Sequence, residues 1–148
     1  MPNLDERRFD LMRESLTWLG TPWKHNQCVK GKEGGVDCIR FLEAIAKIAG
    51  IPLSPIPSRY RRNLIDDSIC EYLDNNFKPT TLDRVVLGDI LVFQWGDIGH
   101  HVGVISRTNK GCTMFIHASL QHKKVLEQIL DTEYLNRVVA VYQLVEDK

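Results

Sequence analysis

The sequence lacks the features of exported, membrane-spanning and nucleic-acid-binding proteins. Its first residues are charged and contain no apolar core of signal-peptide length, and no apolar run approaches the length that crosses a bilayer. Its 19 basic and 19 acidic side chains cancel, so no net charge attracts nucleic acid or an anionic membrane. We therefore expect a protein that is cytoplasmic as synthesised, with neither nucleic acid nor membrane as a partner.

The four cysteines form no CxxC pair, and we find no internal repeat. At 148 residues the chain can bury a real core without disulfide staples, so we expect reduced thiols in one domain over residues 1–148 and no cofactor. A metal site made of Cys38, Cys112, His101 and His117 lacks close-paired ligand spacing. We therefore assign no metal ligand.

The stretch from Gly35 to Gly50 carries the clearest local signals. An apolar helical rhythm runs from Ile39 to Ile48, and Gly50 closes it. Cys38 falls at the helix start, where unpaired N–H groups and the helix dipole favour an anion, and the glycine-rich residues before it indicate an accessible loop. We expect an exposed cysteine with a lowered pKa; the alternative is a small buried hydrophobe.

Periodicity divides the chain into a helical half and a strand-rich half. Helical spacing covers residues 4–19 and about 58–77, with a proline-rich connector over 51–57. The pattern then predicts a turn and a buried strand within 85–95, and strands over 101–106, 113–118 and 137–144, with an edge strand over 124–129 and a helical turn over 131–136. Short connections favour antiparallel pairing, so the fold class is α+β, with N-terminal helices packed on a C-terminal sheet.

Two histidines on neighbouring strands can serve a cysteine nucleophile. Strand alternation allows His101 and His117 to share one surface of the sheet, provided that their strands pair through the intervening turn. A nucleophilic thiol needs a base, and the base needs a group that orients it, so a Cys–His–His arrangement is reasonable. His100 faces the opposite side of its strand. Two further histidines resemble loop or surface residues, His25 and His122.

Five short motifs, in this order, resemble the NlpC-type cell-wall cysteine peptidases, which share the papain-like fold. They are Gly-Thr-Pro-Trp (20–23), Val-Asp-Cys (36–38), Leu-Gly-Asp-Ile-Leu-Val-Phe (87–93), His-Val-Gly-Val (101–104) and Phe-Ile-His-Ala-Ser (115–119). The residues His-Asn-Gln (25–27) and the missing signal sequence are most similar to the branch encoded with phage tails and gene-transfer particles. That branch adds phage tail proteins to the expected partners, and a virion- or tail-associated location.

The resemblance implies a cysteine endopeptidase that cleaves peptidoglycan stem peptides, typically between γ-D-glutamyl and a diamino acid. It makes Cys38 the nucleophile, with its backbone N–H in the oxyanion site, His101 the general base and His117 the residue that orients His101. Asp37 matches the position that meets the free amino group of the substrate.

Two departures from the family pattern affect the substrate side of the cleft. The usual Ser-Gly after the cysteine is replaced by Ile39 and Arg40, and the usual tyrosine is replaced by Trp23. We assign Trp23, Ile39, Asp37 and His100 to substrate binding. The alternative function is a non-catalytic tail-assembly or tail-tip component that keeps the fold and uses its cleft only for binding.

Overall fold

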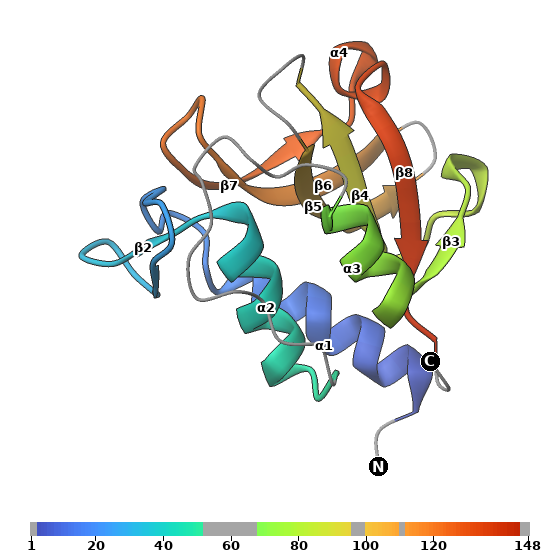
Figure 1. Cartoon of the computed structure of the whole chain (residues 1–148), viewed down its shortest axis with the longest axis horizontal. Helices are drawn as coiled ribbons and strands as arrows, with labels where there is room; N and C mark the ends of the chain where they lie inside the picture. The colour runs from blue at the N-terminus through green and yellow to red at the C-terminus, as the bar shows by residue number, and fades with distance from the viewer. Residues whose placement is uncertain (1–2, 52–67, 96–99, 110–111, 146–148) are drawn as a thin grey trace.

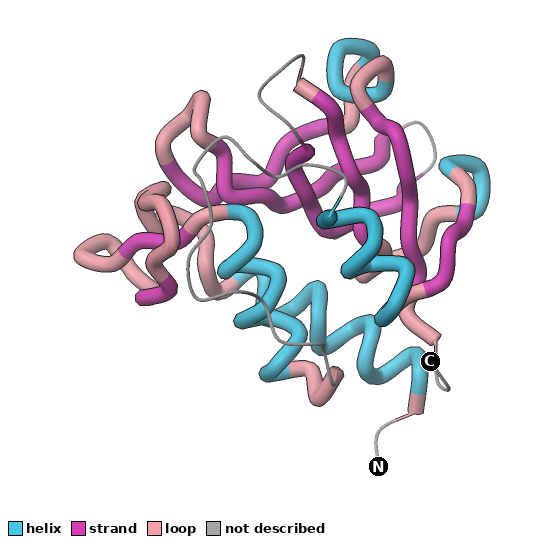
Figure 2. The backbone as a smooth tube through the Cα atoms, in the orientation of Figure 1, coloured by secondary structure: helices cyan, strands magenta, loops and turns pink. Residues whose placement is uncertain are grey.

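Three helices lie against one side of a six-stranded antiparallel sheet (Figure 1). The computed structural model describes residues 3–51, 68–95, 100–109 and 112–145. The helices are α1 (Leu4–Leu16), α2 (Cys38–Ile48) and α3 (Ser68–Asn76), followed by the 3-10 helix η1 (Leu82–Arg84) and the short α4 (Thr132–Leu135). Figure 2 shows the helices in cyan and the strands in magenta. The α+β plan is confirmed.

The sheet has the strand order β3-β8-β4-β5-β6-β7. Its strands are β3 (Lys78–Thr80), β4 (Ile90–Gln94), β5 (His100–Asn109), β6 (Cys112–Ser119), β7 (Lys124–Ile129) and β8 (Val138–Gln143). The five strands predicted from periodicity are present, and β7 lies at an edge as expected. The sequence did not indicate β3 or the hairpin of β1 (Cys28–Val29) and β2 (Gly35–Val36), because two or three residues carry no period.

Both faces of the sheet are apolar, as strand alternation requires when both are covered. One face, which includes Val102 and Ile116, packs against the helices in a core that also contains Phe41 of α2. The other face, which includes Phe93 and Phe115, packs against Tyr134 of α4. The sheet therefore separates two cores.

Helix α2 begins and ends where the sequence predicts. Asp37 is its N-cap, with Oδ1 accepting from the backbone N–H of Arg40 at 2.9 Å, and Gly50 follows the helix with φ +74°. Ile48, which was expected on the inner face, is 65 % exposed. It lies roughly 100° around the helix from the middle of the buried arc, so it faces solvent.

Helix α1 is shorter than predicted. It ends at Leu16, and Leu19 is exposed, whereas Trp18 is buried in its place. The backbone N–H of Gly20 donates to the Val125 carbonyl at 3.0 Å, which ties the chain to β7 soon after the helix. The end of the second predicted helix is confirmed by α3. Its start, over residues 58–67, and most of the proline-rich connector lie outside the described residues.

Candidate active site

A cavity of about 400 Å³ lies at the end of the sheet where β4 and β6 finish and β5 begins. Helix α2 packs on β5 and β6, which brings its first residue to this end. The three predicted catalytic residues share the cavity, together with two of the four predicted substrate residues. The lining consists of Trp23, Cys38, Trp95, His100, His101, His117, Ser119, Leu120, Gln121 and Tyr134.

The two predicted catalytic histidines are in contact. Nε2 of His101 lies 2.7 Å from Nδ1 of His117. Their strands pair with Val104 opposite Ile116, so the histidines are diagonal neighbours on one face, within reach of long side chains. Gly103 leaves room beside them, since a Cβ there would lie 2.9 Å from Cδ2 of Phe115. The predicted juxtaposition of the histidines is confirmed.

The polar chain continues from His117 into β7 and α4. Nε2 of His117 lies 2.5 Å from Oε1 of Gln128, and the same oxygen accepts from the hydroxyl of Tyr134 at 2.9 Å. Sequence reasoning missed both residues. Gln128 had a usable signal, because it is two residues beyond Leu126, the partner of His117 in the edge strand. Tyr134 had none, because α4 is placed by tertiary packing.

Both imidazoles are neutral at physiological pH. Loss of solvent around the ring, and then the neighbouring His117, hold the pKa of His101 well below its ordinary value of 6.5. Burial lowers the pKa of His117 to about 4, although its hydrogen bond to Gln128 opposes the shift. A neutral imidazole can accept a proton, so His101 is in the state that a general base requires.

Cys38 differs from its prediction. It is only 4 % exposed, and burial raises the pKa of its thiol to about 12, with the carboxylate of Asp37 adding to the shift. Backbone N–H groups of Val102, Cys38 and Ile39 hydrogen-bond to the sulfur and lower the pKa by less. The prediction of an exposed, acidic cysteine is wrong, because loss of solvent outweighs the favourable helix start.

The residues before Cys38 are buried as well. Glycines 34 and 35 and Val36 are buried, and Gly35 and Val36 form strand β2 instead of an open loop. Trp23 bridges to Val36 in register and also lines the cavity. The segment in front of the helix is therefore buried and paired instead of forming an open loop.

Two predicted substrate residues do not line the cavity. Asp37 is 3 % exposed, and its Oδ2 accepts from the backbone N–H of Asn26 at 2.6 Å, with Nδ1 of His25 at 3.8 Å. Ile39 is 6 % exposed and belongs to the core between the helices and the sheet. In the structure Asp37 caps the helix and Ile39 packs in the core, and their assignment to substrate binding stays a prediction.

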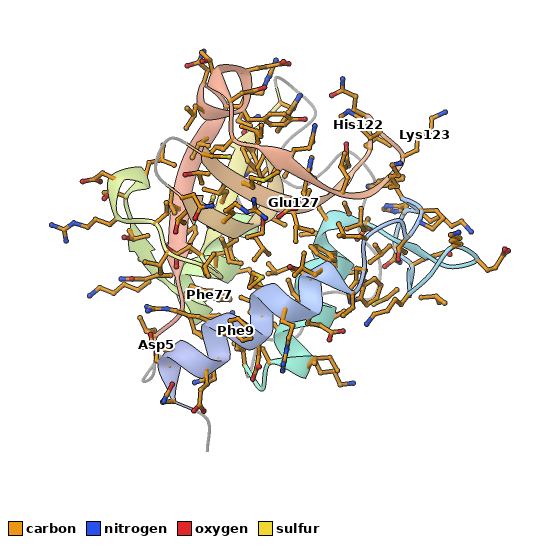
Figure 3. The ribbon with its side chains drawn as sticks, turned by 180° about the vertical axis from the view of Figure 1, so that it is seen from behind. Asp5, Phe9, Phe77, His122, Lys123 and Glu127 are labelled. Atoms are coloured by element: carbon orange, nitrogen blue, oxygen red, sulfur yellow. The ribbon has the colours of Figure 1, made fainter. Side chains whose placement is uncertain are left out.

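The two remaining histidines lie outside the cavity lining. Figure 3 shows His122 and Lys123 at the turn between β6 and β7, on the outside of the molecule. Nδ1 of His122 lies 2.9 Å from the hydroxyl of Ser119, which lines the cavity. His25 lies beside Asp37, as given above, and its side chain is 34 % exposed. Their description as loop or surface residues is accurate for both, since His122 is exposed and His25 lies in a turn.

Within the described part of the chain, no three His, Cys, Asp or Glu side chains are grouped so that they could hold a metal ion. The same residues include no helix of the length and hydrophobicity needed to cross a membrane.

Solved structures share this arrangement of helices and sheet. The NlpC/p60 domain of the peptidoglycan hydrolase SagA superposes with a TM-score of 0.61 over 93 % of this chain and 98 % of that domain, at 16 % sequence identity. The chain has the NlpC/p60 fold. At this identity the likeness establishes the fold alone, and neither a family model nor a curated protein matches the sequence.

Two further structures with the NlpC/p60 fold come from Trichomonas vaginalis. NlpC2 has a TM-score of 0.65 at 16 % identity, and NlpC1 has a TM-score of 0.63 at 17 % identity, each over 97 % of this chain. The chain spans about half of both proteins, 48 % and 45 % of their lengths. The similarity to the phage-tail branch stays a prediction.

Proposed function

We propose that the chain is a cysteine peptidase that hydrolyses an amide bond in peptidoglycan stem peptides through an acyl-enzyme on Cys38. The observation that carries this proposal is one cavity holding a thiol at a helix start and a hydrogen-bonded histidine pair. The SagA neighbour is a peptidoglycan hydrolase with the same fold, which supports the substrate class. The γ-D-glutamyl–diamino acid bond is the bond we expect to be cut.

The protonation states suggest how the reaction begins. Cys38 is a neutral thiol in the free protein, and His101 is a neutral imidazole. Proton transfer therefore accompanies attack: as the sulfur bonds to the substrate carbonyl carbon, His101 takes the thiol proton. The resulting imidazolium keeps its hydrogen bond to the neutral ring of His117.

The remaining steps reuse the same groups. The backbone N–H of Cys38 lies in the first turn of α2, where N–H groups have no intrahelical acceptor, and can donate to the oxyanion. His101 then returns its proton to the leaving amine, giving the thioester. Water, deprotonated by His101, attacks the thioester carbonyl and releases the acid and the Cys38 thiol.

Mass spectrometry with defined muropeptides in H₂¹⁸O tests the proposal. Wild-type protein should release an amine and an acid that carries one ¹⁸O, and Cys38→Ala should reduce turnover about 10⁴-fold or more. Cys28→Ala is the matched control, because Cys28 is exposed and does not line the cavity. Product formation by folded Cys38→Ala, or none by folded wild-type protein, would overturn the proposal.

The burial of Cys38 favours a second candidate, a non-catalytic tail-assembly component that uses the cavity for binding. In that case wild-type protein cleaves no muropeptide yet joins a purified tail complex, and Cys38→Ala assembles equally well. Assembly that fails with both proteins would exclude this candidate.

A further inference from the structure

The hydrogen-bonded chain behind the histidine pair has a defined direction. Oε1 of Gln128 is a carbonyl oxygen, which accepts hydrogen bonds and cannot donate them. It has two neighbours at hydrogen-bond distance, Nε2 of His117 at 2.5 Å and the hydroxyl of Tyr134 at 2.9 Å. Both neighbours must therefore donate, and the proton of neutral His117 is on Nε2.

That proton position determines the next one. With its proton on Nε2, neutral His117 presents an unprotonated Nδ1, which is an acceptor. Nε2 of His101 lies 2.7 Å from this Nδ1, so His101 must donate through Nε2. The one unprotonated ring nitrogen of His101 is then Nδ1, the atom that can accept a proton from a thiol.

We propose that Gln128 and Tyr134 are positioning residues that set the tautomers of both histidines and so make Nδ1 of His101 the proton acceptor. This inference rests on the proposed function for its catalytic consequence, whereas the tautomers themselves are a property of the resting protein. Gln128 acts through His117 and does not line the cavity.

The packing of Tyr134 fixes its hydroxyl beside Oε1 of the Gln128 side-chain amide. Tyr134 is 7 % exposed, and its ring packs against Trp95, Phe115 and His117 with centroid distances of 5.5, 5.1 and 5.9 Å. Burial raises the pKa of its hydroxyl, although the hydrogen bond with Gln128 opposes the shift, so the group keeps a proton to donate to Oε1 of Gln128. An amide turned over would present its NH₂ to His117 and would reverse every donor in the chain.

NMR of ¹⁵N-histidine-labelled protein at about pH 7.5 measures the tautomers without any turnover. In wild-type protein both histidines should carry the proton on Nε2. Gln128→Leu removes the acceptor, so both histidines should show a mixture of tautomers, and kcat should fall about 10- to 100-fold with KM within about threefold. Gln128→Glu keeps an acceptor and should restore the wild-type tautomers and most of kcat.

Tyr134→Phe is the second variant, because it keeps the packed ring and removes one donor. The released amide can turn over, so a second set of histidine signals should appear with a smaller loss of kcat. Wild-type tautomers in folded Gln128→Leu would overturn the inference, as would an Nδ1–H tautomer of His101 in wild-type protein. If the wild-type tautomers are as stated but no muropeptide is cleaved, the proposed function fails and the positioning chain stands.

Discussion

The two sides of the cavity are built in different ways. On the helix side, Cys38 is placed by one local segment: Asp37 caps the helix, and backbone N–H groups meet the sulfur. On the strand side, His101 is held by a side-chain relay that crosses β6 and β7 and ends on α4. The nucleophile thus depends on local structure and its burial, whereas the base depends on the register of three strands.

The largest effect should appear in the rate of cysteine alkylation. This rate tests whether burial of Cys38, on the helix side of the cavity, suppresses its thiolate. At about pH 8, a thiol with a pKa of about 12 is ionised in about one molecule in 10⁴. Partial burial raises the pKa of the Cys28 thiol by less, and Cys28 is exposed, so iodoacetamide should label Cys28 about 100-fold or more faster than Cys38. Peptide mapping at timed intervals measures both rates. The two cysteines should label at similar rates in urea. If Cys38 labels faster than Cys28 in the native protein, the thiol of Cys38 is accessible and has a lowered pKa, as the sequence predicted.

The pH profile of kcat/KM tests the strand side. Because the pKa of His101 lies well below 6.5, its neutral form persists to acid pH, and activity should be flat from about pH 7 to 9. Below the pKa of His101 it should fall about tenfold per pH unit. Circular dichroism over the same range is the control, since histidines with lowered pKa values stabilise the fold above about pH 6.5 and lose this effect as the pH falls. A bell-shaped profile with an alkaline limb near neutrality would indicate a thiolate–imidazolium pair instead.

Gly103→Ala should disturb the strand side more than a matched change disturbs the helix side. Its Cβ would lie 2.9 Å from fully buried Phe115, so we expect a loss of about 1–3 kcal/mol of unfolding free energy and lower turnover. Gly50→Ala is the control: it has open space but φ +74°, and it should cost about 1 kcal/mol with turnover unchanged. Urea denaturation and muropeptide cleavage measure both. Equal turnover in the two variants would show that activity does not depend on the packing of Gly103 against Phe115.

Asp37 links the stability of the helix side to its chemistry and should show the smallest effect. Asp37→Ala removes both the N-cap and the acceptor of the Asn26 N–H and should cost about 1–2 kcal/mol, whereas Asp37→Asn keeps one oxygen acceptor and should cost less. Both variants remove a charge that raises the pKa of Cys38, so its alkylation at fixed pH should become faster. Unchanged alkylation in Asp37→Asn would show that burial alone suppresses the thiolate.

Much of the fold follows from the sequence because its signals are local. The apolar period and Gly50 define α2, and alternation defines the strands that carry His101 and His117. Shared faces on adjacent strands then predict that the histidines meet, since side-chain alternation does not depend on the rest of the fold. The short strands and the early end of α1 were missed because packing decides them.

The local patterns of the sequence are enough to predict that a thiol at a helix start and two histidines on paired strands meet in one cavity. The protonation states of these groups depend instead on contacts between distant segments. Burial outweighs the helix start and keeps Cys38 protonated. The carboxylate oxygens of Asp37 accept hydrogen bonds from the backbone N–H groups of Arg40 and Asn26. Gln128 and Tyr134 approach His117 from distant segments of the chain. Solvent exclusion and hydrogen-bond direction arise from contacts between segments, which local patterns do not encode.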